Sequence, residues 1–261
     1  MQATGNSGRV AIKLADRPYV PVTINGRGPY VFLFDTGAVG GDIVAGVSEE
    51  LALPTSDIHP TFRQIETLSV GEFDWVDLTL PVAKHRAFLL DLNPDHAGFI
   101  GYQMLAGLVV IIDYPSSTLP GNGPLVADVE SEKDVLSVER LSLELSDGHR
   151  FPYRYSVVEV SVNNRGPFRF LLDTGAKACL VSPDLVAALG VSVETKDKGN
   201  DRSVVLDSIE ACGQAQTQLV AKMEDISHVK VNNPLHGYLG HDFLRHFQMT
   251  LNYHDSTWHL C

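Results

Sequence analysis

PYVFLFDTGA occupies residues 29–38, and the chain repeats it as PFRFLLDTGA at residues 167–176. Each copy is a run of bulky apolar residues, typical of a buried strand, that ends in Asp-Thr-Gly. A carboxylate at the end of a buried strand is costly unless a nearby group uses it. The repetition therefore predicts that Asp35 and Asp173 meet across a pseudo-two-fold axis, where the two could share a proton and activate a water molecule.

The similarity of the two halves extends well beyond these stretches. INGRGP at 24–29 corresponds to VNNRGP at 162–167, and both have the Asn and Gly residues of a hairpin turn. GFIGYQML at 98–105 corresponds to GYLGHDFL at 237–244. The first pair of segments is offset by 138 positions and the second pair by 139, so the halves stay in register. Such a repeat indicates an internal duplication.

The pattern predicts an all-β protein with a few short helices. Its strands are many and short, and long helical periodicity is absent. Short helical turns are expected at 47–53 and 185–191. The predicted organisation is an N-terminal lobe, a connecting segment rich in Gly, Pro and acidic residues, and a C-terminal lobe, at residues 1–119, 120–139 and 140–261.

Composition restricts the partners of the chain. The 261 residues carry a formal net charge of −12, which disfavours nucleic acid and anionic membrane surfaces. No apolar run approaches the roughly 20 residues that span a bilayer. The first residues have neither a basic region nor an apolar core, so no signal peptide is expected. A cytoplasmic protein and an exported one whose signal has been removed both remain open.

The cysteines and histidines give no metal-site pattern. Cys179, Cys212 and Cys261 have no C-x-x-C spacing, and we interpret them as small hydrophobic residues plus a terminal thiol. A disulfide between the first two is the alternative. Three histidines near the C-terminus are five positions apart, which does not place two ligands on one helical face: His236, His241 and His246. We expect no metal and no cofactor.

The doubled motif resembles the retropepsin-like aspartic proteases, here as a tandem single chain with a pepsin-like, two-lobed plan. It is carried by Asp-Thr-Gly-Ala at 35–38 with Phe-Ile-Gly at 99–101, and by Asp-Thr-Gly-Ala at 173–176 with Tyr-Leu-Gly at 238–240. The resemblance implies two pseudo-symmetric lobes, a cleft between them, and a peptide or protein substrate. Because one chain supplies both aspartates, a monomer is expected to suffice.

The resemblance also assigns roles to residues. Asp35 and Asp173 would be the catalytic dyad, and Thr36 and Thr174 would bond across to the backbone of the opposite loop. The positions expected to line the cleft and to bind peptide through main-chain hydrogen bonds are Gly37, Ala38, Gly175 and Ala176. The positions expected to support the loops from behind are Ile100, Gly101, Leu239 and Gly240.

One departure from the family pattern concerns the flap, the hairpin that closes over substrate. Residues 59–65 stand where the first flap should be, yet no glycine lies between Gly46 and Gly71. Residues 196–202 offer a Gly199-Asn200 tip, so we expect the second hairpin to be the flap and Gly199 to contact substrate. The missing glycines leave open an alternative: a catalytically weak or inactive peptide-binding or regulatory module on the same fold.

Overall fold

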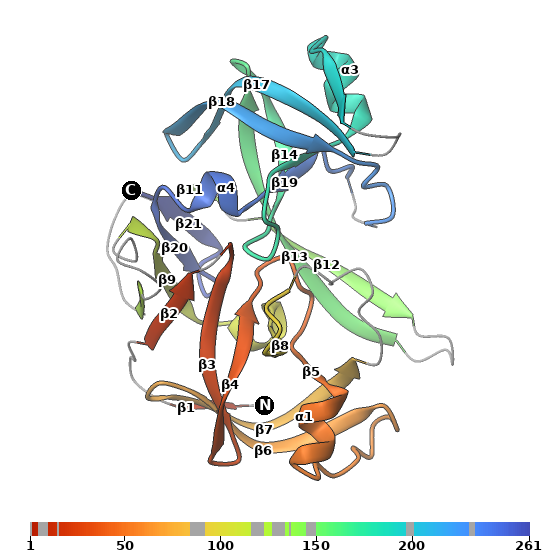
Figure 1. Cartoon of the computed structure of the whole chain (residues 1–261), viewed down its shortest axis with the longest axis vertical. Helices are drawn as coiled ribbons and strands as arrows, with labels where there is room; N and C mark the ends of the chain where they lie inside the picture. Colours follow the sequence, from red (N-terminus) through yellow and green to blue (C-terminus); the bar gives the residue numbers. More distant parts are fainter. Residues whose placement is uncertain are drawn as a thin grey trace.

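A computed structural model describes residues 2–4, 10–14, 16–83, 92–115, 123–126, 134–135, 137–144, 150–196, 201–229 and 233–261. Within these residues the chain is mostly β, with four short helices. Figure 1 shows one group of strands at the bottom, a second group at the top, and further strands between them. The all-β, bilobal fold predicted from the sequence is confirmed.

The first half of the chain builds the lower lobe in Figure 1 and part of the middle. Its strands are β1 (Gln2–Thr4), β2 (Val10–Leu14), β3 (Pro18–Ile24), β4 (Arg27–Phe34), β5 (Asp42–Val44), β6 (Phe62–Val70), β7 (Phe73–Ala83), β8 (His96–Ile100) and β9 (Val109–Asp113). Its helices are α1 (Ala45–Glu50) and α2 (Tyr102–Leu105). The strand β10 (Gly123–Val126) follows.

The second half repeats this order with additions. Its strands are β11 (Asp134–Val135), β12 (Ser137–Glu144), β13 (Arg150–Val162), β14 (Arg165–Leu172), β15 (Leu180–Val181), β16 (Val193–Lys196), β17 (Asp201–Ala211), β18 (Gln214–Met223), β19 (Gly237–Leu239), β20 (Gln248–Asn252) and β21 (Thr257–Leu260). Its helices are α3 (Pro183–Leu189) and α4 (His241–Leu244).

The two lobes share a sheet. The C-terminal strand β20 pairs antiparallel with β9 of the first half, and β10 lies between β9 and β2. β11 pairs with β21. The segment expected to connect the lobes, 120–139, therefore contributes β10, β11 and the start of β12 to the sheets. The division into two lobes with a connecting segment stays a prediction, because chain segments cross between the halves.

The strands that end in the two Asp-Thr-Gly loops have equivalent surroundings. β4 pairs antiparallel with β3 and parallel with β8, and β14 pairs in the same way with β13 and β19. The registers agree as well: Leu33 lies opposite Phe99, and Leu171 lies opposite Tyr238. This topology brings each Asp-Thr-Gly loop next to the glycine that ends the second motif of its own lobe.

A large hydrophobic core contains residues of both halves, including Phe32, Phe34, Phe170 and Leu172 of the two motif strands. Cys179 is buried and Cys212 is half-buried, and neither forms a disulfide. The alternative of a disulfide between them is therefore wrong. No helix in the described part of the chain is long and apolar enough to cross a membrane.

Candidate active site

The two Asp-Thr-Gly loops begin where β4 and β14 end. The amide of Asp35 donates to the carbonyl of Ile100 at 2.9 Å, and the amide of Asp173 donates to the carbonyl of Leu239 at 3.1 Å. These bonds continue the parallel pairing of β4 with β8 and of β14 with β19 by one residue. Each aspartate is thus positioned by a strand rather than by a free loop.

Each aspartate carboxylate is oriented by its own loop. Oδ1 of Asp35 accepts from the amides of Gly37 and Ala38 at 2.8 and 3.0 Å. Oδ1 of Asp173 accepts from the equivalent amides two and three residues later, both at 2.9 Å. Two amide donors per carboxylate fix its plane and leave Oδ2 for other partners.

Threonine side chains tie the two loops together. The hydroxyl of Thr36 donates to the carbonyl of Leu172 at 2.7 Å, and that of Thr174 donates to the carbonyl of Phe34 at 2.6 Å. Each threonine oxygen also accepts from the amide of the other threonine at 3.1 Å. Both threonines are fully buried. The result is a closed set of four hydrogen bonds between lobes, the arrangement expected from the sequence.

The glycines of the two loops pack against the opposite carboxylates. A Cβ added to Gly37 would lie 2.6 Å from Oδ1 of Asp173, and one added to Gly175 would lie 2.7 Å from Oδ1 of Asp35. Real Cβ atoms essentially never come so close to an oxygen. The space that any side chain would need at these two positions is taken by the carboxylates. Glycine is therefore required sterically, and Asp35 and Asp173 lie close together.

The proximity of the aspartates changes their ionisation. Burial raises the pKa of Asp35 well above its usual range, and the charge of Asp173 raises it further. Burial also raises the pKa of Asp173, although the amide donors of its own loop oppose this. Two close carboxylates cannot both ionise cheaply, so the pair holds one proton over a range of pH. Asp35 and Asp173 are half-buried, so each keeps part of its surface in contact with solvent.

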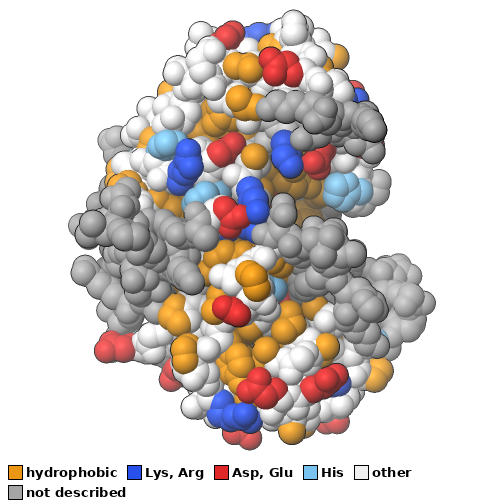
Figure 2. Space-filling model, in the orientation of Figure 1, with side chains coloured by type: hydrophobic (Ala, Val, Ile, Leu, Met, Phe, Trp, Pro, Cys, Tyr) orange, Lys and Arg blue, Asp and Glu red, His pale blue; other side chains and the backbone are white. Residues whose placement is uncertain are grey.

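Apolar side chains lie at the surface between the two lobes and next to both motif strands. Figure 2 shows the surface hollowed between the upper and lower lobes, with hydrophobic side chains at the bottom of the hollow. Two small apolar clusters lie apart from the main core, one in each half: Tyr19, Leu33 and Phe99, and Val157, Leu171, Ile226 and Leu235. Leu33 and Leu171 lie two residues before the aspartates, and side chains two apart point to the same face of a strand.

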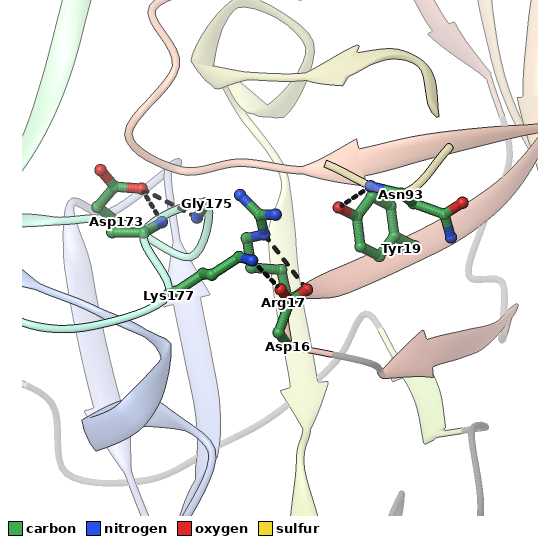
Figure 3. Close-up of polar contacts among 8 residues, drawn as sticks. Asp16, Arg17, Tyr19, Asn93, Asp173, Gly175 and Lys177 are labelled. Carbon is green, nitrogen blue, oxygen red and sulfur yellow. Dashed lines mark hydrogen bonds and ion pairs between the residues drawn. The ribbon is translucent and has the colours of Figure 1, made fainter. Parts of the chain in front are cut away.

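Charged residues flank the dyad on the Asp173 side (Figure 3). Lys177 Nζ lies 2.6 Å from Asp16 Oδ2, and Arg17 Nε lies 3.5 Å from Asp16 Oδ1. On the equivalent side of Asp35, Nη1 of Arg154 donates to the hydroxyl of Tyr102 at 3.0 Å. The contacts of Lys177 with Asp16 and of Arg154 with Tyr102 join residues far apart in the sequence, so these two also hold the halves together.

Tyrosines lie behind both loops. Tyr102 makes an edge-to-face contact with Tyr253, and His241, at the position equivalent to Tyr102, makes the same kind of contact with Tyr114. Burial lowers the pKa of His241 to about 4, so this imidazole is neutral near pH 7. In the described part of the chain no group of three or more His, Cys, Asp or Glu residues could hold a metal ion.

The expected substrate-binding residues fall into three groups. The glycines Gly37 and Gly175 lie at the dyad. The alanines Ala38 and Ala176 lie there too, but their amides donate to the aspartates and their carbonyls accept from Tyr102 and His241 at 2.9 and 2.8 Å. The main-chain amides and carbonyls of both alanines are therefore already bonded within the protein. Gly199 lies outside the described residues.

The flap predictions can be compared with the structure only in part. β16 and β17 pair antiparallel, and residues 197–200, where the Gly-Asn tip was expected, lie outside the described residues. In the first half a bridge joins Thr55 to Arg63, and His59 is buried with its Nδ1 2.7 Å from the hydroxyl of Thr61. His59 therefore packs into the lobe, and β6 begins at Phe62. The hairpin of the second half remains the proposed flap.

Sequence reasoning did not identify the residues around the dyad. Arg17, Arg154, Tyr114 and Tyr253 lie outside the two quoted motifs. A signal was available: Tyr114 and Tyr253 are 139 positions apart, the same offset as the second motif pair. The charged residues have no such pattern, because residue 155, the equivalent of Arg17, is a tyrosine.

Comparison with protein families supports the resemblance. Residues 158–246 match the model of a family described as gag-polyprotein putative aspartyl proteases. The matched segment contains Asp173-Thr174-Gly175 and the second motif at 238–240. The C-terminal lobe is thus similar to retropepsin-like aspartyl proteases, which supports a protease-like function in general. No curated protein matches the chain.

Proposed function

We propose that the protein is an aspartic endopeptidase that hydrolyses extended peptides by activating water between Asp35 and Asp173. The observation that carries this proposal is the reciprocal packing of each carboxylate against the glycine of the opposite loop. Four hydrogen bonds between Thr36 and Thr174 and the opposite loops maintain that packing. A structural turn would not need two buried-strand carboxylates to converge in this way.

The mechanism follows from a dyad that holds one proton. The ionised carboxylate takes a proton from a water molecule while the protonated one polarises the carbonyl of the scissile bond. Attack gives a tetrahedral gem-diol, which both carboxyl groups stabilise by hydrogen bonds. A proton then passes to the leaving amine as the C–N bond breaks, and no covalent intermediate with the enzyme forms. The reaction needs no cofactor.

The peptide would lie in the cleft between the lobes. The apolar clusters around Leu33 and Leu171 suit apolar side chains on either side of the scissile bond. The carbonyls of Gly37 and Gly175 would accept hydrogen bonds from the peptide backbone, and the hairpin of β16 and β17 would cover it. Because both aspartates come from one chain, a monomer would suffice.

A second candidate function is a peptide-binding or regulatory module with little or no catalysis. The first half favours it, because His59 is buried in the lobe and residues 59–65 contain no glycine that would form a glycine-rich flap. With a single hairpin to exclude water, closure of the site would be incomplete. The two candidates share the cleft and differ only in turnover.

Mass-spectrometric cleavage profiling of a diverse peptide library separates the two. We expect the wild-type protein to cleave, and we expect Asp35→Asn and Asp173→Asn each to lower kcat/KM by about 1,000-fold or more. Asp184→Asn, an exposed aspartate in α3, is the matched control and should leave cleavage unchanged. Full pepstatin-sensitive cleavage by Asp35→Asn would refute the proposal. Peptide binding without cleavage between about pH 3 and pH 7 would favour the second candidate.

A further inference from the structure

A groove in the C-terminal half lies next to β14, the strand that leads into Asp173. The groove has a volume of about 760 Å³, and the buried side chains of Ile226 and Leu235 form its inner wall. The same two residues pack with Leu171, which lies two positions before Asp173. The groove is therefore continuous with the apolar cluster beside the dyad, and its size is typical of a ligand site.

The groove also reaches the hairpin that we propose as the flap. Arg202, near the start of β17, lies on its rim, together with Asp225 of the segment after β18. Both of these side chains are exposed, whereas the apolar inner wall is buried. An apolar side chain of a peptide would leave water on entering the groove, which favours binding. The groove thus suits an apolar side chain of a substrate that lies under the hairpin.

One wall of the groove is the segment 233–236, which precedes β19. Its Leu235 lines the groove. The last residue of the segment is anchored through its main chain, because the amide of His236 donates to the carbonyl of Arg169 at 2.8 Å. The amide of Arg169 in turn donates to Nδ1 of the His236 ring at 3.1 Å. The main chain of Arg169 thus fixes the end of the segment.

The side chain of Arg169 holds the beginning of the same segment. Its Nη1 donates to the carbonyls of Asn233 and Pro234, the second at 3.3 Å. Arg169 lies two positions before Leu171 on β14, and side chains two apart point to the same face of a strand. Hydrogen bonds from a charged donor are stronger than those from a neutral one. Arg169 therefore bonds to the wall on both sides of Leu235.

The equivalent position in the N-terminal half cannot form such a clamp. Val31 stands in place of Arg169, and it packs against the apolar cluster of its own half. A valine side chain has no hydrogen-bond donor. The segment before β8 is instead bonded to Tyr19, whose hydroxyl accepts from the amide of Asn93 at 3.1 Å. The guanidinium clamp is thus a feature of the C-terminal half.

We propose that Arg169 is a positioning residue for substrate selection: it fixes the wall around Leu235, and the groove so formed accepts one apolar side chain of the substrate next to the scissile bond. This inference rests on the proposed protease function and deepens it. Arg169 acts through the wall and not on the reacting atoms. A wall that is already fixed need not be ordered when the substrate binds, so less of the binding free energy is lost.

Hydrogen exchange followed by mass spectrometry tests the clamp without any substrate. Arg169→Val introduces the residue of the N-terminal half, and amides in the segment 233–236 should exchange faster by about tenfold. The matched control is Arg165→Val, because Arg165 lies on the same strand and its Nη1 donates to the Ala188 carbonyl in α3 at 2.6 Å. This control should leave exchange in the segment unchanged. Unchanged exchange in Arg169→Val would overturn the proposal.

Cleavage profiling of a peptide library tests the selection. The wild-type protein should prefer Leu, Met or Phe over Ala at one position next to the scissile bond, and in Arg169→Val this preference should fall about tenfold. KM for a peptide with Leu at that position should rise, while kcat changes less than about twofold. Arg169→Lys keeps a charged donor and should retain part of the preference, and Arg165→Val should retain all of it.

A second variant, Arg169→Gln, should show the same faster exchange and the same loss of preference, so the test does not depend on the folding of the valine variant. Faster exchange with an unchanged cleavage profile would mean that the clamp serves stability alone, and it would overturn the proposal. So would a wild-type profile with no apolar preference on either side of the scissile bond.

The outcomes also separate this inference from the proposed function. If the wild-type protein cleaves no peptide, the proposed endopeptidase function fails, and peptide affinity measured by fluorescence takes the place of cleavage. Arg169→Val should then weaken the binding of Leu-containing peptides about tenfold relative to Ala-containing ones. If the wild-type protein also binds no library peptide, the inference falls together with the function.

Discussion

The loops around Asp35 and Asp173 are nearly identical where they touch each other and different where they meet the rest of the protein. Within the loops, the amide donors, the crossed threonine bonds and the glycine contacts occur twice with almost the same distances. Outside them, Arg17 and Lys177 flank one aspartate, and Tyr155 and Val39 occupy the equivalent places near the other. The shared part is what a dyad needs to form, and the variable part gives the two loops different neighbours.

The glycines give the largest expected effect. We expect Gly37→Ala and Gly175→Ala each to lower kcat by roughly 100-fold or more, because the new methyl group must displace the opposite carboxylate. The losses should be similar, since the two contacts are equivalent. Steady-state kinetics on a peptide found by cleavage profiling provides the measurement.

Gly46→Ala is the matched control for the glycines. Gly46 lies in α1, and a Cβ added there has no atom within 4 Å. Alanine also favours helix over glycine by about 1 kcal/mol, so this variant should keep full activity and gain slightly in stability. Normal turnover by Gly175→Ala would show that the carboxylates can move apart without loss, and that the close packing is not functional.

The threonines should give the next largest effect, on stability. Thr36→Val and Thr174→Val each remove a hydroxyl that donates to a buried carbonyl and accepts from a buried amide. Leaving such groups unpaired should cost about 2 kcal/mol in the free energy of unfolding, in either variant. Urea denaturation measures this cost, and Thr→Ser at the same positions, which keeps the hydroxyl, should cost less. If only one of the two variants lost stability, the hydrogen bonds of the two threonines would not be equivalent, against the prediction.

The sequence predicted the symmetric part of the site because that part is local. Each Asp-Thr-Gly stretch follows its own buried strand, so the strand ends, the turns and the duplication can be recognised within about ten residues. The pairing of β4 with β8 and of β14 with β19 then follows from the second motif in each half. The all-β, two-lobed fold follows from the same repetition.

The asymmetric part could not be predicted from the sequence because it depends on contacts between distant segments. Asp16 and Lys177 are 161 positions apart, and only the folded chain brings their side chains to 2.6 Å. The pairing of β20 with β9 is also between the halves, and no turn or motif in either strand indicates it. The position of the Ala38 main chain depends on α2, because the amide of Tyr102, the first residue of that helix, donates to the Ala38 carbonyl.

Helices α1 and α3 extend the comparison away from the site, with the smallest expected effect. Ser182 caps α3 by accepting from the amide of Leu185 at 3.2 Å, whereas the equivalent residue Val44 gives α1 no side-chain cap. Ser182→Ala should therefore lower the free energy of unfolding by about 1 kcal/mol. Val44→Ser should change it little, because the new cap bond is offset by loss of a half-buried valine side chain. Urea denaturation measures both changes. If the two variants lost the same free energy of unfolding, the cap bond of Ser182 would not account for the loss in Ser182→Ala.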